Sequence, residues 1–142
     1  MTTLTTPELQ QAQQALSSNR ETQAALAALT THNGDLETSF AQLWSQQHPS
    51  QTFAPDQPDR SLLKSTLTVL RQEICGSEGF RGQLDEYRKN PGNAPLLTGL
   101  IGTLSGLAIA NGIPLDTPLA AIVVLYVSKV GLAIICDYTK PV

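Results

Sequence analysis

The amino-acid sequence predicts an all-α protein in which two helical modules are joined by a linker. Apolar residues recur at spacings of three and four along most of the chain, which is the period of one helix face. Residues 46–59 hold three prolines and no such period, as is typical of a linker. Residues 96–136 carry two charges, Asp116 and Lys129, so this stretch must be hidden from water. The predicted organisation is a three-helix bundle at 5–46, a Pro/Gln-rich linker at 47–57 and a helical module at 58–140.

The first module opens on a helix start signal. Thr6-Pro7-Glu8 combines a hydroxyl cap, a proline and an acidic residue in one turn. A second short helix is expected from Arg20 to Leu29, followed by the turn dipeptide Asn33-Gly34. Asp35 is expected to cap a third helix, and the apolar stripe of that helix consists of Leu36, Phe40, Leu43 and Trp44.

The string ALTTHNGDLETSFAQLW at residues 28–44 resembles the second and third helices of UBA-like domains. It is similar in particular to the form found at the N-terminus of translation elongation factor Ts. The resemblance implies a compact three-helix bundle over about 5–46 that binds a protein partner. Many ubiquitin-binding members carry a Met-Gly-Phe-type loop at the position that residues 17–20 occupy here. Because this loop is absent, the resemblance implies a general binding role rather than ubiquitin recognition. The alternative is an unrelated three-helix bundle with an Asn-Gly turn.

Four helices are expected in the second module, at about 58–75, 77–89, 95–110 and 117–136. The last two form an antiparallel hairpin because their connection is short. The final helix has no polar stripe, and such a helix lies in the centre of a bundle, at a subunit interface or in lipid. Lys129 on this helix is expected to extend its ammonium group to solvent or to a carboxylate.

Two interpretations of the hairpin stay open. In the favoured one the preceding helices cover part of it and a homo-oligomer hides the rest, with Gly102, Gly106 and Lys129 as self-association residues. The Gly102-x-x-x-Gly106 pattern allows close backbone approach, which is a dimerisation face in a membrane and tight helix packing in a soluble core. In the alternative interpretation the hairpin inserts into a membrane.

The residues that usually carry catalysis or metal binding do not cluster in this sequence. His32 and His48 have no partners at ligand spacing, and no phosphate-binding loop or nucleophile motif is present. We therefore expect no enzyme activity, no metal and no cofactor. The net charge of −3 and the scarcity of aromatic residues among the basic ones disfavour nucleic-acid binding. Cys75 and Cys136 are expected to be buried free thiols, as suits a cytoplasmic protein without a secretory signal, and a redox or linking role is the alternative.

The expected function is that of a non-enzymatic adaptor that binds an unknown protein partner and self-associates through its apolar hairpin. The residues expected to face the partner are His32, Asn33, Gly34, Asp35, Glu37 and Trp44. Trp44 is a candidate anchor because an aromatic residue at the end of a short helix can fill a partner's pocket. The alternative is a small membrane-inserting effector or anchor, located at the inner face of or within a cell membrane, with a cytoplasmic N-terminal recruitment domain.

Overall fold

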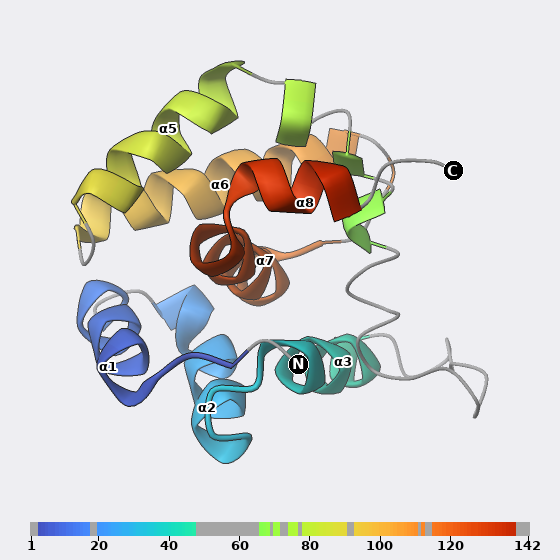
Figure 1. Ribbon diagram of the computed structural model, residues 1–142. Helices are drawn as coiled ribbons and strands as arrows, with labels where there is room; N and C mark the ends of the chain where they lie inside the picture. Colours follow the sequence, from blue (N-terminus) through green and yellow to red (C-terminus); the bar gives the residue numbers. More distant parts are fainter. Residues whose placement is uncertain are drawn as a thin grey trace.

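The protein is described by a computed structural model (Figure 1). The structure describes residues 3–17, 20–47, 66–68, 70–71, 74–76, 78–90, 93–110, 112 and 115–138. The predicted linker at 47–57 lies outside the described residues except for Gln47, and so do His48 and most of the expected helix at 58–75.

Helices make up the described part of the chain, which confirms the all-α prediction. They are α1 (Thr6–Ala15), the 3₁₀ helix η1 (Arg20–Thr22), α2 (Gln23–Thr31), α3 (Leu36–Gln47), α5 (Glu78–Lys89), α6 (Ala94–Ala110), α7 (Thr117–Val130) and α8 (Leu132–Tyr138). Described residues between 66 and 76 are also helical. The β-type pairing found among the described residues is an isolated antiparallel bridge between Thr3 and Asp35.

The starts of α1, α3 and α7 are fixed by side-chain caps, whereas the Thr22 side chain makes no such hydrogen bond at the start of α2. Thr5 and Glu8 form a capping box at α1, one residue earlier than the expected cap at Thr6. Asp35 caps α3 by accepting a hydrogen bond from the Thr38 amide at 3.1 Å. Asp116 caps α7 in the same way, with the Leu119 amide as donor.

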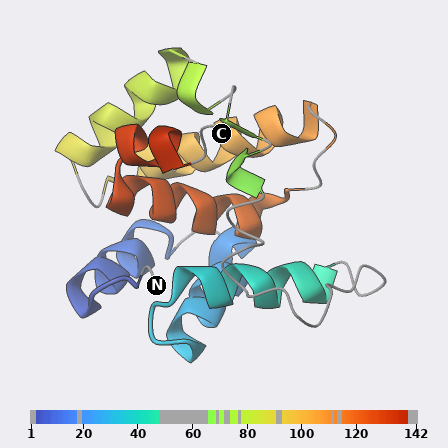
Figure 2. The same ribbon diagram turned by 45° about the vertical axis from the view of Figure 1, so that its right-hand side comes forward.

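Helix α7 is the centre of the molecule. In Figure 1 and Figure 2, α1, α2 and α3 lie below it, and α5, α6 and α8 lie above it. Its residues from Leu119 to Leu125, together with Val127, are buried. α7 contacts η1, α2 and α3 from the first predicted module, and α6 and α8 from the second. One hydrophobic cluster therefore runs through both modules.

The apolar end of the chain is two helices rather than one. The sequence pattern predicted a single helix from about 117 to 136, whereas α7 ends at Val130 and α8 begins at Leu132. Gly131 separates them with a φ of +102°, a backbone conformation that glycine adopts without a steric penalty. Because the chain turns there, α8 packs back against α7.

The two cysteines form a disulfide bond, which corrects the expectation of free thiols. Cys75 and Cys136 have Cα atoms 6.0 Å apart and close a loop with a sequence separation of 61. The bond joins the helical segment 74–76 to α8, and the Arg71 Nε donates a hydrogen bond to the Cys136 carbonyl oxygen at 3.3 Å. The sequence did not reveal this pairing because nothing in the spacing of two cysteines shows that their helices lie together.

Removing the disulfide should lower stability substantially. Closing a loop of this length removes about 4 kcal/mol of chain entropy from the unfolded state in the loop-closure model. Urea unfolding of the native chain should therefore show a lower midpoint when dithiothreitol is present. A Cys75→Ser/Cys136→Ser variant should have the same unfolding midpoint as the reduced native chain, and dithiothreitol should not change the midpoint of this variant. An unchanged midpoint in the native chain would contradict the disulfide.

Gly34 should tolerate no side chain. Its φ is +87°, its carbonyl accepts a hydrogen bond from the Leu4 amide at 2.9 Å, and an added Cβ would lie 2.6 Å from the Leu4 carbonyl oxygen. Gly112 is a matched control, because its φ of +77° carries similar strain but no atom of the part of the chain that the structure describes lies within 4 Å of its added Cβ. Gly34→Ala should cost more than Gly112→Ala, which should cost about 1–3 kcal/mol from backbone strain alone. Equal losses in urea unfolding would show that the contact with Leu4 is not tight.

Candidate functional site

A small cleft opens where α1, α5 and α7 meet. Its volume is about 150 Å³, and its walls combine polar and apolar side chains from three parts of the chain. The polar lining residues are Glu8, Gln11, Arg88, Ser128 and Lys129, and the apolar ones are Leu4, Tyr87 and Leu125. The cleft is well below the roughly 300–1,000 Å³ of pockets for drug-sized ligands, so it suits only a small group.

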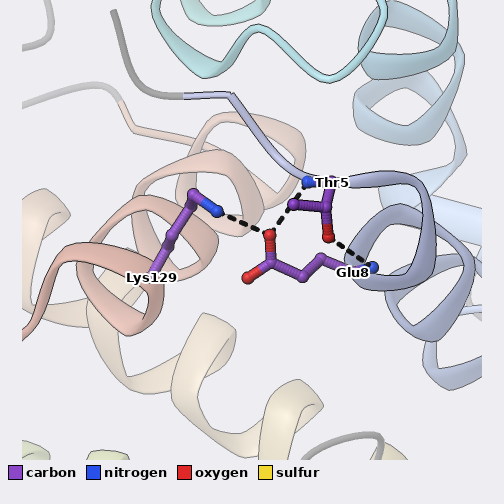
Figure 3. Close-up of polar contacts among 3 residues, drawn as sticks. All are labelled: Thr5, Glu8 and Lys129. Atoms are coloured by element: carbon purple, nitrogen blue, oxygen red, sulfur yellow. Dashed lines mark hydrogen bonds and ion pairs between the residues drawn. The ribbon is translucent and has the colours of Figure 1, made fainter.

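The N-terminal cap of α1 positions the carboxylate in this cleft. The Thr5 amide donates to Glu8 Oε1 at 2.9 Å, and the Glu8 amide donates to Thr5 Oγ1 at 3.3 Å. Lys129, in the last turn of α7, donates from Nζ to the same Glu8 oxygen at 2.6 Å (Figure 3). The ion pair thus connects the first helix of the chain to the central one, and Lys129 reaches a carboxylate as the sequence predicted.

The environment of Glu8 lowers the pKa of its carboxyl group. Partial burial raises this pKa, but the hydrogen bonds from Lys129 and Thr5, with the Lys129 charge, outweigh that effect. The Lys129 and Glu8 side chains are 26% and 38% exposed, so solvent screens their attraction. The pair therefore fixes geometry more than it adds stability.

Two further polar groups at the cleft are available for a ligand. The Ser128 hydroxyl oxygen is buried and has no hydrogen-bond partner among the described residues. Arg88, near the end of α5, is exposed, and its Nη1 lies 3.6 Å from the point where a Cβ on Gly131 would stand. Within the described part of the chain, Arg88 forms no ion pair.

The outer face of α6 is the second feature with functional potential. The exposed residues of this helix carry no charge; they are Pro95, Thr98, Gly99, Gly102, Gly106, Ile109 and Ala110. An added Cβ on any of its three glycines would meet no atom of the described residues within 4 Å. Gly102 and Gly106 therefore do not pack against the neighbouring hairpin helix α7. Ile109, a large apolar side chain on this face, is 63% exposed.

The loop expected to face a protein partner is held largely by the chain itself. The His32 ring is hydrogen-bonded to the Gln42 side chain, and Asp35 caps α3. Gly34 is buried against Leu4, whereas Asn33 is exposed with a φ of +55°.

The two α3 residues expected to contact the partner occupy different environments. Glu37 is 5% exposed and belongs to the interior. Trp44 is partly buried and stacks on Phe40 with ring centroids 6.2 Å apart. The residues predicted for partner binding thus do not form one continuous exposed patch, because Gly34 and Glu37 are buried.

Sequence reasoning did not identify the cleft. Glu8 was visible only as a helix-start residue, and Arg88 only as one of several basic residues on its segment. Ser128 gave no signal, because an isolated serine in an apolar helix usually hydrogen-bonds to its own backbone. These residues become neighbours only when α1, α5 and α7 pack.

In the described part of the chain, no group of three or more His, Cys, Asp or Glu side chains is placed to hold a metal ion. The helices of the described residues include none with both the length and the apolar content needed to cross a bilayer. Comparison with protein-family models, with curated proteins and with solved structures gives no match.

The Glu8–Lys129 pair should give the protein a small acid-sensitive stability. Because the pKa of Glu8 is lower in the folded chain, the contribution is present above the unfolded pKa of 4.5 and is lost as pH falls through the lower folded pKa. Urea unfolding should show that Glu8→Gln costs up to about 1 kcal/mol at pH 7 and less at pH 3. Glu86→Gln, on the exposed surface of α5, is the control. The same loss for Glu8→Gln at both pH values would contradict an ionic contribution.

Proposed function

We propose that this chain is a non-enzymatic protein-interaction module that self-associates through the outer face of α6. The observation that carries the proposal is an exposed, uncharged helix face with open space above three glycines and a protruding Ile109. A face of this kind leaves apolar surface in water, and covering it is favourable.

A second copy of the chain is the partner that best fits this face. The exposed residues of the α6 face carry no charge that would attract or orient a charged partner. Two identical uncharged faces, in contrast, meet without repulsion. A two-fold symmetric contact places the same patch on both subunits, so one self-complementary face is sufficient. The 17 residues of α6 give a contact line of about 26 Å.

Glycine sets how closely the two helices would approach. Gly99, Gly102 and Gly106 remove side chains along one line of α6, so a second backbone can lie against it. The proposed self-association surface is smaller than the whole hairpin expected from the sequence. α7 is buried inside the chain and Lys129 is paired with Glu8, so both support the subunit rather than contact a second copy.

The N-terminal bundle supplies the second interaction in this proposal. Its resemblance to UBA-like domains supports binding of a protein partner. The accessible members of the predicted set are the exposed Asn33 and the partly buried His32, Asp35 and Trp44. This surface lies on the turn between α2 and α3 and on α3, whereas the self-association face lies on α6. A self-associated chain would therefore display the partner surface in more than one copy, and multivalent display raises avidity.

Alanine substitutions in α6 test the self-association directly. Gly102→Ala/Gly106→Ala should stabilise the monomer by up to about 1 kcal/mol per site, because alanine favours an exposed helix. The added methyl groups should separate the paired backbones and raise the dimer Kd at least about tenfold. Sedimentation velocity over a concentration series measures the Kd, and urea unfolding measures the stability.

Gly82→Ala provides the matched control. Gly82 lies in α5 and has equally open surroundings, so the variant should gain stability without a change in association. A native chain that stays monomeric at all concentrations would refute the proposal. An unchanged Kd in the α6 variant would also refute it.

A further inference from the structure

We propose that the cleft between α1, α5 and α7 binds a small monoanionic carboxylate. The inference is independent of the proposed function, because it rests on residues of other helices and not on the outer face of α6.

The charges of the cleft fit one negative charge. Arg88 and Lys129 carry two positive charges, and Glu8 carries one negative charge. The Glu8 carboxylate occupies one donor of the Lys129 ammonium, which has two more N–H groups to offer. The Arg88 guanidinium forms no ion pair with a described residue, and its planar fork matches the two oxygens of a carboxylate.

The Ser128 hydroxyl is the strongest single indication of a ligand. It is buried at the cleft and has no hydrogen-bond partner among the described residues. Buried polar atoms in folded proteins are nearly always paired, so an orphaned hydroxyl calls for a partner. A carboxylate oxygen in the cleft would accept its hydrogen bond.

The apolar side of the cleft favours an organic anion over an inorganic one. Leu4 and Leu125 are buried side chains that reach the cleft, and Tyr87 adds an aromatic surface. An alkyl group beside the carboxylate would cover these surfaces, whereas phosphate would place polar oxygens against them. Glu8 also disfavours the second negative charge that phosphate carries at neutral pH.

Carboxylates of this size have two sources, a free small acid or the C-terminus of a peptide. The cleft volume of about 150 Å³ accommodates several water molecules and therefore a ligand of a few heavy atoms. An NMR titration of the full-length oxidised chain separates the sources with four probes at pH 7: acetate, N-acetylglycine, N-acetylglycinamide and inorganic phosphate. The amide of N-acetylglycine is the matched neutral probe.

The expected result is saturable shifts of the Ser128 and Lys129 amides with acetate and N-acetylglycine but not with the amide. Tighter binding of N-acetylglycine would assign the site to a peptide terminus, and equal or weaker binding would assign it to a free acid. Arg88→Gln should weaken binding at least tenfold and Ser128→Ala at least threefold. Ser128→Ala should keep the fold, because it removes only an unpaired hydroxyl.

Lys89→Gln is the control for a general loss of positive charge. Lys89 is the neighbour of Arg88 on α5 but does not line the cleft, so its variant should bind like the native chain. Absence of saturation with both carboxylates would overturn the inference. So would tighter binding of phosphate, or an equal loss in the Lys89 and Arg88 variants.

Discussion

The burial of α7 is the constraint on which the rest of the structure depends. From Leu119 to Leu125 this helix is apolar and buried on every side, and each fully buried Leu, Ile or Val contributes about 1.5–3 kcal/mol. Neither half of the chain covers it alone, since α2 and α3 pack on one side and α6 and α8 on the other. The N-terminal bundle was expected to be a separate module, but its helices form part of the core around α7.

The same constraint explains where the potential binding features lie. Helices that enclose α7 bring Glu8 and Arg88, 80 positions apart in the sequence, to one cleft next to Ser128 and Lys129. α6 turns its large apolar residues toward α5 and α7 and leaves its glycines outside. The outer face of α6 is thus uncharged because its exposed positions are occupied mainly by glycine and other small or uncharged residues.

Local signals in the sequence were sufficient to predict the helices but not the contacts between them. The Asp35 cap, the positive φ of Gly34 and the isolation of α7 from water follow from residue type and spacing. The break at Gly131 also has a local signal, a glycine within the apolar run. The Cys75–Cys136 bond and the orphaned Ser128 hydroxyl depend on packing between distant segments. No pattern within one helix encodes these two features, which is also why the cleft was not predicted.

Cooperative unfolding is the most direct test of a core shared through α7. Trp44 is the single tryptophan and lies on α3, so its fluorescence reports the N-terminal helices, whereas circular dichroism at 222 nm reports the whole chain. A Val123→Ala variant creates a cavity inside α7 and should lower both urea transitions by the same amount, with coincident curves before and after the substitution. A Trp44 transition that separates from the circular dichroism curve, or that ignores the substitution, would show that the N-terminal bundle folds independently of α7.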